Sequence, residues 1–158
     1  MKLQLALLST AVFLTACVSN YPVKIVTKGP LICAANEVCP ELAMRWIDEK
    51  RNGFKVTAEI TNPEQYDIKQ FNFIIDGQPY TYSTITPTEY SAKESSKTSS
   101  NSIMVPVSFL NSFRNAKDIE LKLITDKGEI SRPIIKANGE KSSAYMTFLK
   151  GYTGEVQQ

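Results

Sequence analysis

The chain has 158 residues, with 18 Lys and Arg against 16 Asp and Glu, and it has no histidine. The near-neutral charge gives no support for nucleic-acid binding or for a polybasic membrane patch. The absence of histidine excludes Ser-His-Asp and Cys-His catalysis and histidine-containing zinc sites. The length suits one domain with a substantial buried core.

The N-terminus has the layout of a secretory signal peptide. One cation, Lys2, precedes a run at residues 5–14 that is apolar apart from Ser9 and Thr10. As a helix this run would be about 15 Å long, half the thickness of a hydrocarbon core, so it is too short to span a bilayer. Small residues then lead to Cys17, as they lead to the cleavage site of a signal peptide.

The end of this segment reads Leu14, Thr15, Ala16 and Cys17. It resembles the lipobox of bacterial lipoproteins, in which Leu, a small or hydroxyl residue, and Ala or Gly precede the Cys. The resemblance implies cleavage before Cys17, a diacylglycerol on its sulfur and an acyl chain on the new amino group. Such chains together would anchor the protein firmly to a membrane. The alternative is an ordinary signal peptide with an incidental cysteine.

The resemblance also implies a location and a division of the chain. Val18 stands where an Asp tends to retain enterobacterial lipoproteins at the inner membrane, so the outer membrane is expected; its periplasmic face and the cell surface are not distinguished. We expect a cleaved signal peptide at 1–16, a lipidated N-terminus and tether at 17–32, and a single β-rich domain at 33–158. Within the tether, residues 23–27 are a candidate short strand.

The two remaining cysteines, Cys33 and Cys39, are separated by five residues. Because an exported chain enters an oxidising compartment, we expect them to form a disulfide. A redox pair is disfavoured because the spacing differs from Cys-X-X-Cys. A metal site is disfavoured because partner ligands are lacking, and no cofactor is expected.

Residues 40–51 leave two interpretations open. Pro40 and Glu41, followed by apolar residues at helical spacing, fit a helix start. The alternation of Leu42, Met44 and Trp46 fits a strand instead. The Asn-Gly pair at 52–53 favours a hairpin of 42–49 with 54–61.

Several segments further along the chain show the period-2 alternation of half-buried strands. They are 54–61, 68–75, 79–85, 103–107, 118–125 and 129–135. Pro133 lacks an N–H, so the last of these is expected at a sheet edge or at a bulge. Residues 91–102 contain six Ser and no large apolar residue, which predicts a mobile loop. That loop could bind a partner or be modified, but a tolerated insertion is favoured.

Helical spacing of apolar residues predicts two short helices, at about 108–116 and 143–150. We expect Ser108 and Ser143 to cap them, and Gly151 to lie near the end of the second. Joined by hairpin turns, the six to eight strands predict a mainly β protein, as an antiparallel sheet or a two-layer sandwich, with α+β as the alternative.

The sequence contains few candidates for a binding or catalytic site. Tyr80 and Tyr82 alternate on one strand and form a candidate binding face, although cross-strand packing is the more common role of such residues. Ser95, Ser96 and Lys97 could suggest a histidine-free hydrolase, but a mobile loop would not preorganise them. No catalytic residue and no metal ligand is predicted.

The first functional hypothesis is therefore a non-enzymatic envelope lipoprotein that binds an envelope protein or polysaccharide, and not nucleic acid. The second is an accessory or chaperone-like subunit of an envelope secretion or assembly complex, which would accept a partner strand at 129–135. The third is the hydrolase.

Overall fold

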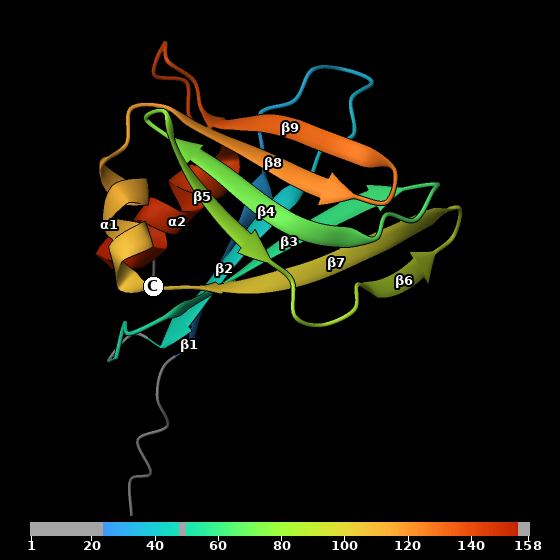
Figure 1. The fold of residues 1–158 in the computed structure, drawn as a ribbon, viewed down its shortest axis with the longest axis horizontal. Coiled ribbons are helices and arrows are strands. Elements are labelled where there is room, and N and C mark those ends of the chain that lie inside the picture. The colour runs from blue at the N-terminus through green and yellow to red at the C-terminus, as the bar shows by residue number, and fades with distance from the viewer. Residues whose placement is uncertain (1–23, 48–49, 155–158) are drawn as a thin grey trace, which may run out of the picture.

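The computed structural model describes residues 24–47 and 50–154. They form two antiparallel sheets and two helices (Figure 1), which confirms the mainly β prediction. The five-stranded sheet contains, in spatial order, β1 (Lys24–Pro30), β2 (Glu41–Ile47), β3 (Phe54–Asn62), β7 (Ser96–Val105) and β6 (Glu89–Lys93). The four-stranded sheet contains β5 (Gln78–Ser83), β4 (Ile68–Ile75), β8 (Ile119–Thr125) and β9 (Gly128–Ile135).

The core lies between the two sheets and follows directly from the alternation in the sequence. On β3, residues Phe54, Val56, Ala58 and Ile60 are fully buried while Lys55 is exposed. The strands of the other sheet bury Ile68, Phe71, Phe73, Ile119, Leu121 and Leu123 in the same way. Each sheet thus contributes one apolar face to a common layer, as in other packed sheet pairs.

The helices α1 (Val107–Asn115) and α2 (Ser143–Thr153) lie together at one end of the sandwich (Figure 1). Their aromatic residues continue the core, since Phe109 contacts Phe73 at 5.0 Å and Phe113 contacts Phe148 at 5.6 Å between ring centroids. Both helices were expected, but the caps differ. The first is preceded by Pro106, not Ser108, and its N-cap has no side-chain hydrogen bond.

The second helix is capped one residue earlier than expected and ends three residues later. Ser142 Oγ accepts a hydrogen bond from the Tyr145 N–H at 3.2 Å. Gly154, with φ +82°, forms the left-handed C-cap. Gly151, which we expected near that end, is instead buried inside the helix. A Cβ there would lie 2.6 Å from Thr27 Cγ2 on β1. The absence of a side chain at Gly151 therefore allows α2 to pack closely against β1.

The open question at residues 40–51 is resolved as a strand. Leu42, Met44 and Trp46 are buried on β2, which pairs with β3 in an antiparallel hairpin. Trp46 belongs to the core, with its ring 5.4 Å from that of Phe54. Residues 48–49, at the end of the predicted strand, lie outside the described residues.

The tether predicted at 17–32 is wrong over its second half. Lys24–Pro30 forms β1, which pairs along its whole length with β2. A Cβ on Gly29 would lie 2.7 Å from the Ala144 backbone N, so a glycine is needed here for contact with α2. Residues 24–27 of the short strand expected at 23–27 belong to the longer strand β1. Residues 17–23 lie outside the described part of the chain.

The mobile loop predicted at 91–102 is also wrong. It belongs to the β6–β7 hairpin, and residues 97–105 of β7 pair with β3. The prediction of a mobile loop did not take into account that β3 provides a partner strand for these residues. Hydroxyl groups link the two strands on the outer face, at 2.8 Å between Thr57 and Ser102 and at 3.0 Å between Thr61 and Thr98. Cross-strand pairs of this kind stabilise a polar sheet face without apolar burial.

A candidate binding groove between two sheet edges

A cavity of about 710 Å³ lies between β5, at the edge of one sheet, and the C-terminal half of β7 in the other. Its volume is in the range of ligand-binding clefts. The β5 side contributes Thr81, Tyr82 and Ser83, and the segment that connects β5 to β6 contributes Ile85, Thr86 and Pro87. The opposite side is formed by Lys55, Thr57, Glu89, Ser100, Asn101, Ser102, Ile103 and Met104. We call it the β5–β7 groove.

The groove exists because the pairing of β6 with β7 stops halfway. β6 pairs with residues 96–100 of β7, and the last pair is Glu89 with Ser100. If this register continued, Pro87 would stand opposite Ser102. Proline has no N–H to donate to a ladder, and the chain turns away instead. In the described structure, residues 101–105 of β7 therefore have a strand neighbour on the β3 side alone.

Asn101 holds this junction together from inside. Its side chain is 4% exposed, and its Nδ2 donates to the carbonyl oxygens of Ile68 at 2.9 Å and Thr86 at 3.0 Å. Its Oδ1 accepts a hydrogen bond from the Ser102 N–H at 2.8 Å. One side-chain amide thus forms hydrogen bonds with backbone groups of the first residue of β4, of the connecting segment and of β7.

Thr88 supports Asn101 from the other end of the connecting segment. Its Oγ1 accepts the Ile68 N–H at 2.9 Å and donates to Asp67 Oδ1 at 2.8 Å. Asn101 Nδ2 lies 3.3 Å from the same hydroxyl. Nearby, the fully buried Ser99 accepts the Tyr66 N–H at 2.9 Å. Because these buried polar groups are paired with one another, they fix the position of the segment that borders the groove.

The groove combines hydroxyl groups with exposed apolar side chains. Ile85 is 95% exposed and Met104 is 63% exposed. Lys55 and Glu89 bring one charge of each sign. Such a surface suits an extended, largely uncharged ligand that can form hydrogen bonds and also bury a few apolar groups.

The sequence predicted Tyr80 and Tyr82 as a binding face, and the structure places both rings against α1. They contact Phe109 edge-on, at 5.7 and 5.6 Å between centroids. Tyr80 Oη donates to Ser112 Oγ at 3.1 Å. Burial, with a smaller effect of Tyr80, raises the pKa of Tyr82 above its usual value. Both residues thus pack against α1, and of the two only Tyr82 lines the β5–β7 groove.

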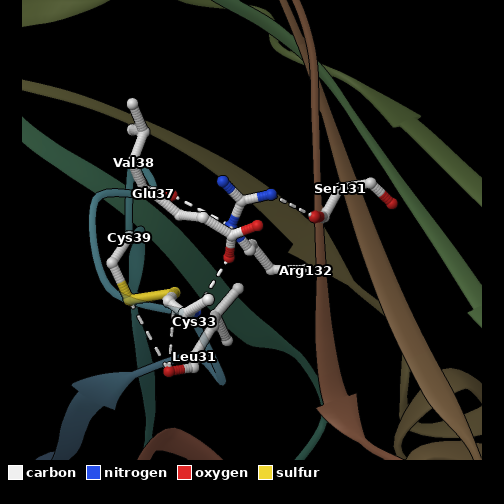
Figure 2. The surroundings of a disulfide bond; sticks show 8 residues. Leu31, Cys33, Glu37, Val38, Cys39, Ser131 and Arg132 are labelled. Carbon is white, nitrogen blue, oxygen red and sulfur yellow. Dashed lines mark hydrogen bonds and ion pairs between the residues drawn. A yellow bond between two sulfur atoms is a disulfide. The ribbon is translucent and has the colours of Figure 1, made fainter.

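The predicted disulfide between Cys33 and Cys39 is confirmed, with the two Cα atoms 5.7 Å apart. Figure 2 shows that its loop lies beside β9. Arg132 Nε donates to the Val38 carbonyl at 3.0 Å and forms an ion pair with Glu37 at 3.4 Å.

This loop also covers the edge that was expected to accept a partner strand. The Ile32 N–H donates to the Pro133 carbonyl at 3.1 Å. Pro133 lies at the sheet edge and beside a register shift, so both features expected of it are confirmed. At Arg132 and Pro133 the outer side of β9 is therefore occupied by the chain itself.

Replacing Cys33 and Cys39 together with serine is expected to lower the free energy of unfolding by about 2 kcal/mol. The reason is that a cross-link over so short a loop restricts the unfolded chain by roughly that amount. Urea unfolding under oxidising conditions measures the difference. An Ala35→Ser substitution in the same loop is the control and should have no measurable effect. Equal stability of the double variant and the wild type would contradict the expectation.

The Ser95, Ser96 and Lys97 cluster lies at the tip of the β6–β7 hairpin. Ser96 Oγ donates to the Lys93 carbonyl at 3.1 Å, and Glu94 has a φ of +55°, as the tight turn requires. Over residues 24–47 and 50–154, no group of three or more Cys, Asp and Glu is arranged to hold a metal ion.

Cys17 lies outside the described residues. No helix in the described part of the chain is both long and apolar enough to cross a membrane. A scan against protein-family models and searches of curated proteins and of solved structures found no match to this chain.

Sequence reasoning missed the groove itself, and with it the roles of Asn101, Ser102 and Met104. The one local signal was Pro87, which interrupts the pairing of a strand. It becomes informative once the register of β6 on β7 is known.

Proposed function

We propose that the protein is a lipid-anchored binding module of the bacterial outer membrane that acts by binding an envelope component and not by catalysis. The observation that carries this proposal is the sequence from Leu14 to Cys17 at the end of a short apolar segment. Only six residues separate Cys17 from Lys24, the first residue of β1. Such a connection extends by at most about 25 Å, so the sandwich is held near the membrane surface.

The β5–β7 groove supports a binding role. Its lining is mainly hydroxyl-bearing and apolar, with Lys55 and Glu89 as the charged members. Those side chains provide contact area and hydrogen bonds to a ligand, whereas general acid–base catalysis requires a titrating group held against the reacting atoms.

Cell fractionation tests the anchor. We expect the wild-type protein to sediment with outer membranes, and the Cys17→Ser variant to lose membrane association. The double Cys33→Ser, Cys39→Ser variant is the control, because it loses two cysteines and keeps the lipidation site. A wild-type protein in the soluble fraction, or a Cys17→Ser variant that sediments like the wild type, would contradict the proposal.

An accessory or chaperone-like subunit of an envelope assembly complex is the second candidate. The expected strand-accepting edge on β9 is partly occupied by the disulfide loop, but residues 101–105 of β7 offer another edge. Crosslinking in intact cells separates the two candidates. A binding module should give one constant partner, and a chaperone-like subunit should give several clients whose amounts follow secretion.

A further inference from the structure

We propose that the β5–β7 groove binds an extended peptide segment, which pairs with residues 101–105 of β7 and lies end to end with β6. This inference rests on the proposed binding function and names the chemistry of the ligand. The peptide would occupy the position beside β7 that β6 does not reach. Adding a strand to an exposed sheet edge is a common mode of peptide recognition. A five-residue strand is about 17 Å long.

The backbone of β7 is oriented for such pairing. In an antiparallel ladder, alternate residues direct both backbone polar groups away from a given neighbour. The Ser102 N–H bonds to the Asn101 side chain on the groove side, so the backbone polar groups of Ser102 point away from β3. Met104, two residues further along, directs its N–H and C=O the same way, toward the groove. Because Asn101 already occupies the Ser102 N–H, a ligand strand would bond to the Ser102 C=O and to the Met104 N–H and C=O.

The other strand edges are protected against a partner strand. β9 is partly covered by the disulfide loop and contains Pro133. β6 is five residues long with every side chain exposed, and it includes Glu89 and Lys93. β1 ends at Pro30 and includes exposed lysines, and β5 includes Pro79. Short edges, charges and prolines are the usual means of preventing edge pairing. In the described structure, residues 101–105 have no strand neighbour on the groove side, although the Ser102 N–H there is bonded to Asn101, and their exposed side chains are small or apolar.

The side chains define the ligand further. Alternate residues of an added strand would face the outer side of the groove, where Met104 and Ile85 are exposed. The hydroxyl groups of Ser102, Thr57 and Thr81 line the same groove. The groove therefore suits an uncharged segment in which apolar residues alternate with Ser or Thr.

A peptide fits this groove better than a polysaccharide does. Sugar rings bind against the face of an exposed aromatic side chain, and the aromatic residue of the groove is Tyr82. That ring is held edge-on against Phe109. The Ser102 C=O and the Met104 N–H and C=O, which point into the groove, suit a partner with amide groups at strand spacing.

The test is an NMR titration of the mature domain with a capped seven-residue peptide of alternating Thr and Val. We expect saturable shifts at the backbone amides of residues 101–105, and at least a tenfold weaker affinity for the same peptide N-methylated at every second residue. N-methylation removes the donors that strand pairing requires while keeping the side chains. Equal affinity of both peptides would overturn the inference.

The matched variants are Met104→Pro and Met104→Val. Proline removes the N–H that faces the groove, whereas valine keeps it. Both should retain the β3 pairing, which is checked by the dispersion of the amide spectrum. We expect at least tenfold weaker peptide binding for Met104→Pro, and binding within threefold of the wild type for Met104→Val. Equal binding by both variants would overturn the inference.

Two further outcomes would overturn it while leaving the binding function intact. One is a shift of the same amides by an envelope-derived oligosaccharide and not by the peptide. The other is a concentration-dependent shift without added ligand, which would make a second copy of this chain the occupant. Failure of the proposed anchor is seen separately, in the fractionation of the Cys17→Ser variant.

Discussion

Replacing Asn101 with leucine is expected to lower the free energy of unfolding by about 3 kcal/mol. The leucine side chain would leave the carbonyls of Ile68 and Thr86 and the N–H of Ser102 without their present partner. Each buried polar group that loses its partner costs about 1–3 kcal/mol. The Ser102 N–H faces the groove and Thr86 is exposed, so both of these backbone groups can be hydrated. Most of the loss therefore comes from the buried side of the junction, where Asn101 Nδ2 contacts the Ile68 carbonyl and the Thr88 hydroxyl.

Urea unfolding of Asn101→Leu and Asn72→Leu provides the comparison. Asn72 makes one side-chain hydrogen bond, to Thr81 on the outer face of the neighbouring strand at 3.2 Å. We expect its loss to cost less than about 1 kcal/mol, because a half-exposed group can be rehydrated. Similar stabilities of the two variants would show that Asn101 does not hold the junction of β4, β7 and the connecting segment.

Replacing Gly29 with valine is expected to destabilise the protein by about 3 kcal/mol. An added Cβ would lie 2.7 Å from the Ala144 N and 2.8 Å from the Ser143 carbonyl carbon, and these are backbone atoms at the start of α2. A clash with backbone cannot be relieved by a rotamer change, so the helix would have to move off β1. Overpacking of this kind costs about 1–3 kcal/mol, and sometimes more.

Gly53→Val is the matched control for this prediction. The atom nearest to a Cβ added at Gly53 would be Met104 Cε, at 3.8 Å, which is an ordinary contact. We expect thermal unfolding to show a large fall in midpoint for Gly29→Val and a small change for Gly53→Val. The near-ultraviolet circular dichroism of the aromatic cluster around α2 should change in the first variant alone. Equal midpoints would mean that α2 does not pack on β1 as described.

Alternation of apolar residues predicted most of the strands. The β3 pattern from Phe54 to Ile60 and the β4 pattern at 68–75 were read correctly because each strand has one buried face, which imposes a period of two. The disulfide followed from the compartment that Cys17 implies. The first helix followed from the spacing of Phe109, Leu110 and Phe113, and the second from that of Ala144, Tyr145 and Phe148.

Features that depend on tertiary pairing could not be predicted from the sequence. The Ser-rich strand β7 has few apolar residues to show a period, and its ordering comes from β3, which pairs with residues 97–105. Gly151 was interpreted as a residue near a helix end, whereas both it and Gly29 mark close helix–strand contacts. The groove depends on where the β6 pairing stops, which Pro87 and Asn101 determine together.

The most direct test of the proposed function is intact mass spectrometry of the protein purified from bacterial membranes. We expect the mature chain to begin at Cys17 and to have the added mass of a diacylglycerol and an amide-linked acyl chain, while Cys33 and Cys39 remain joined by a disulfide. A chain that begins elsewhere, or an unmodified Cys17, would contradict the account of a lipid-anchored module.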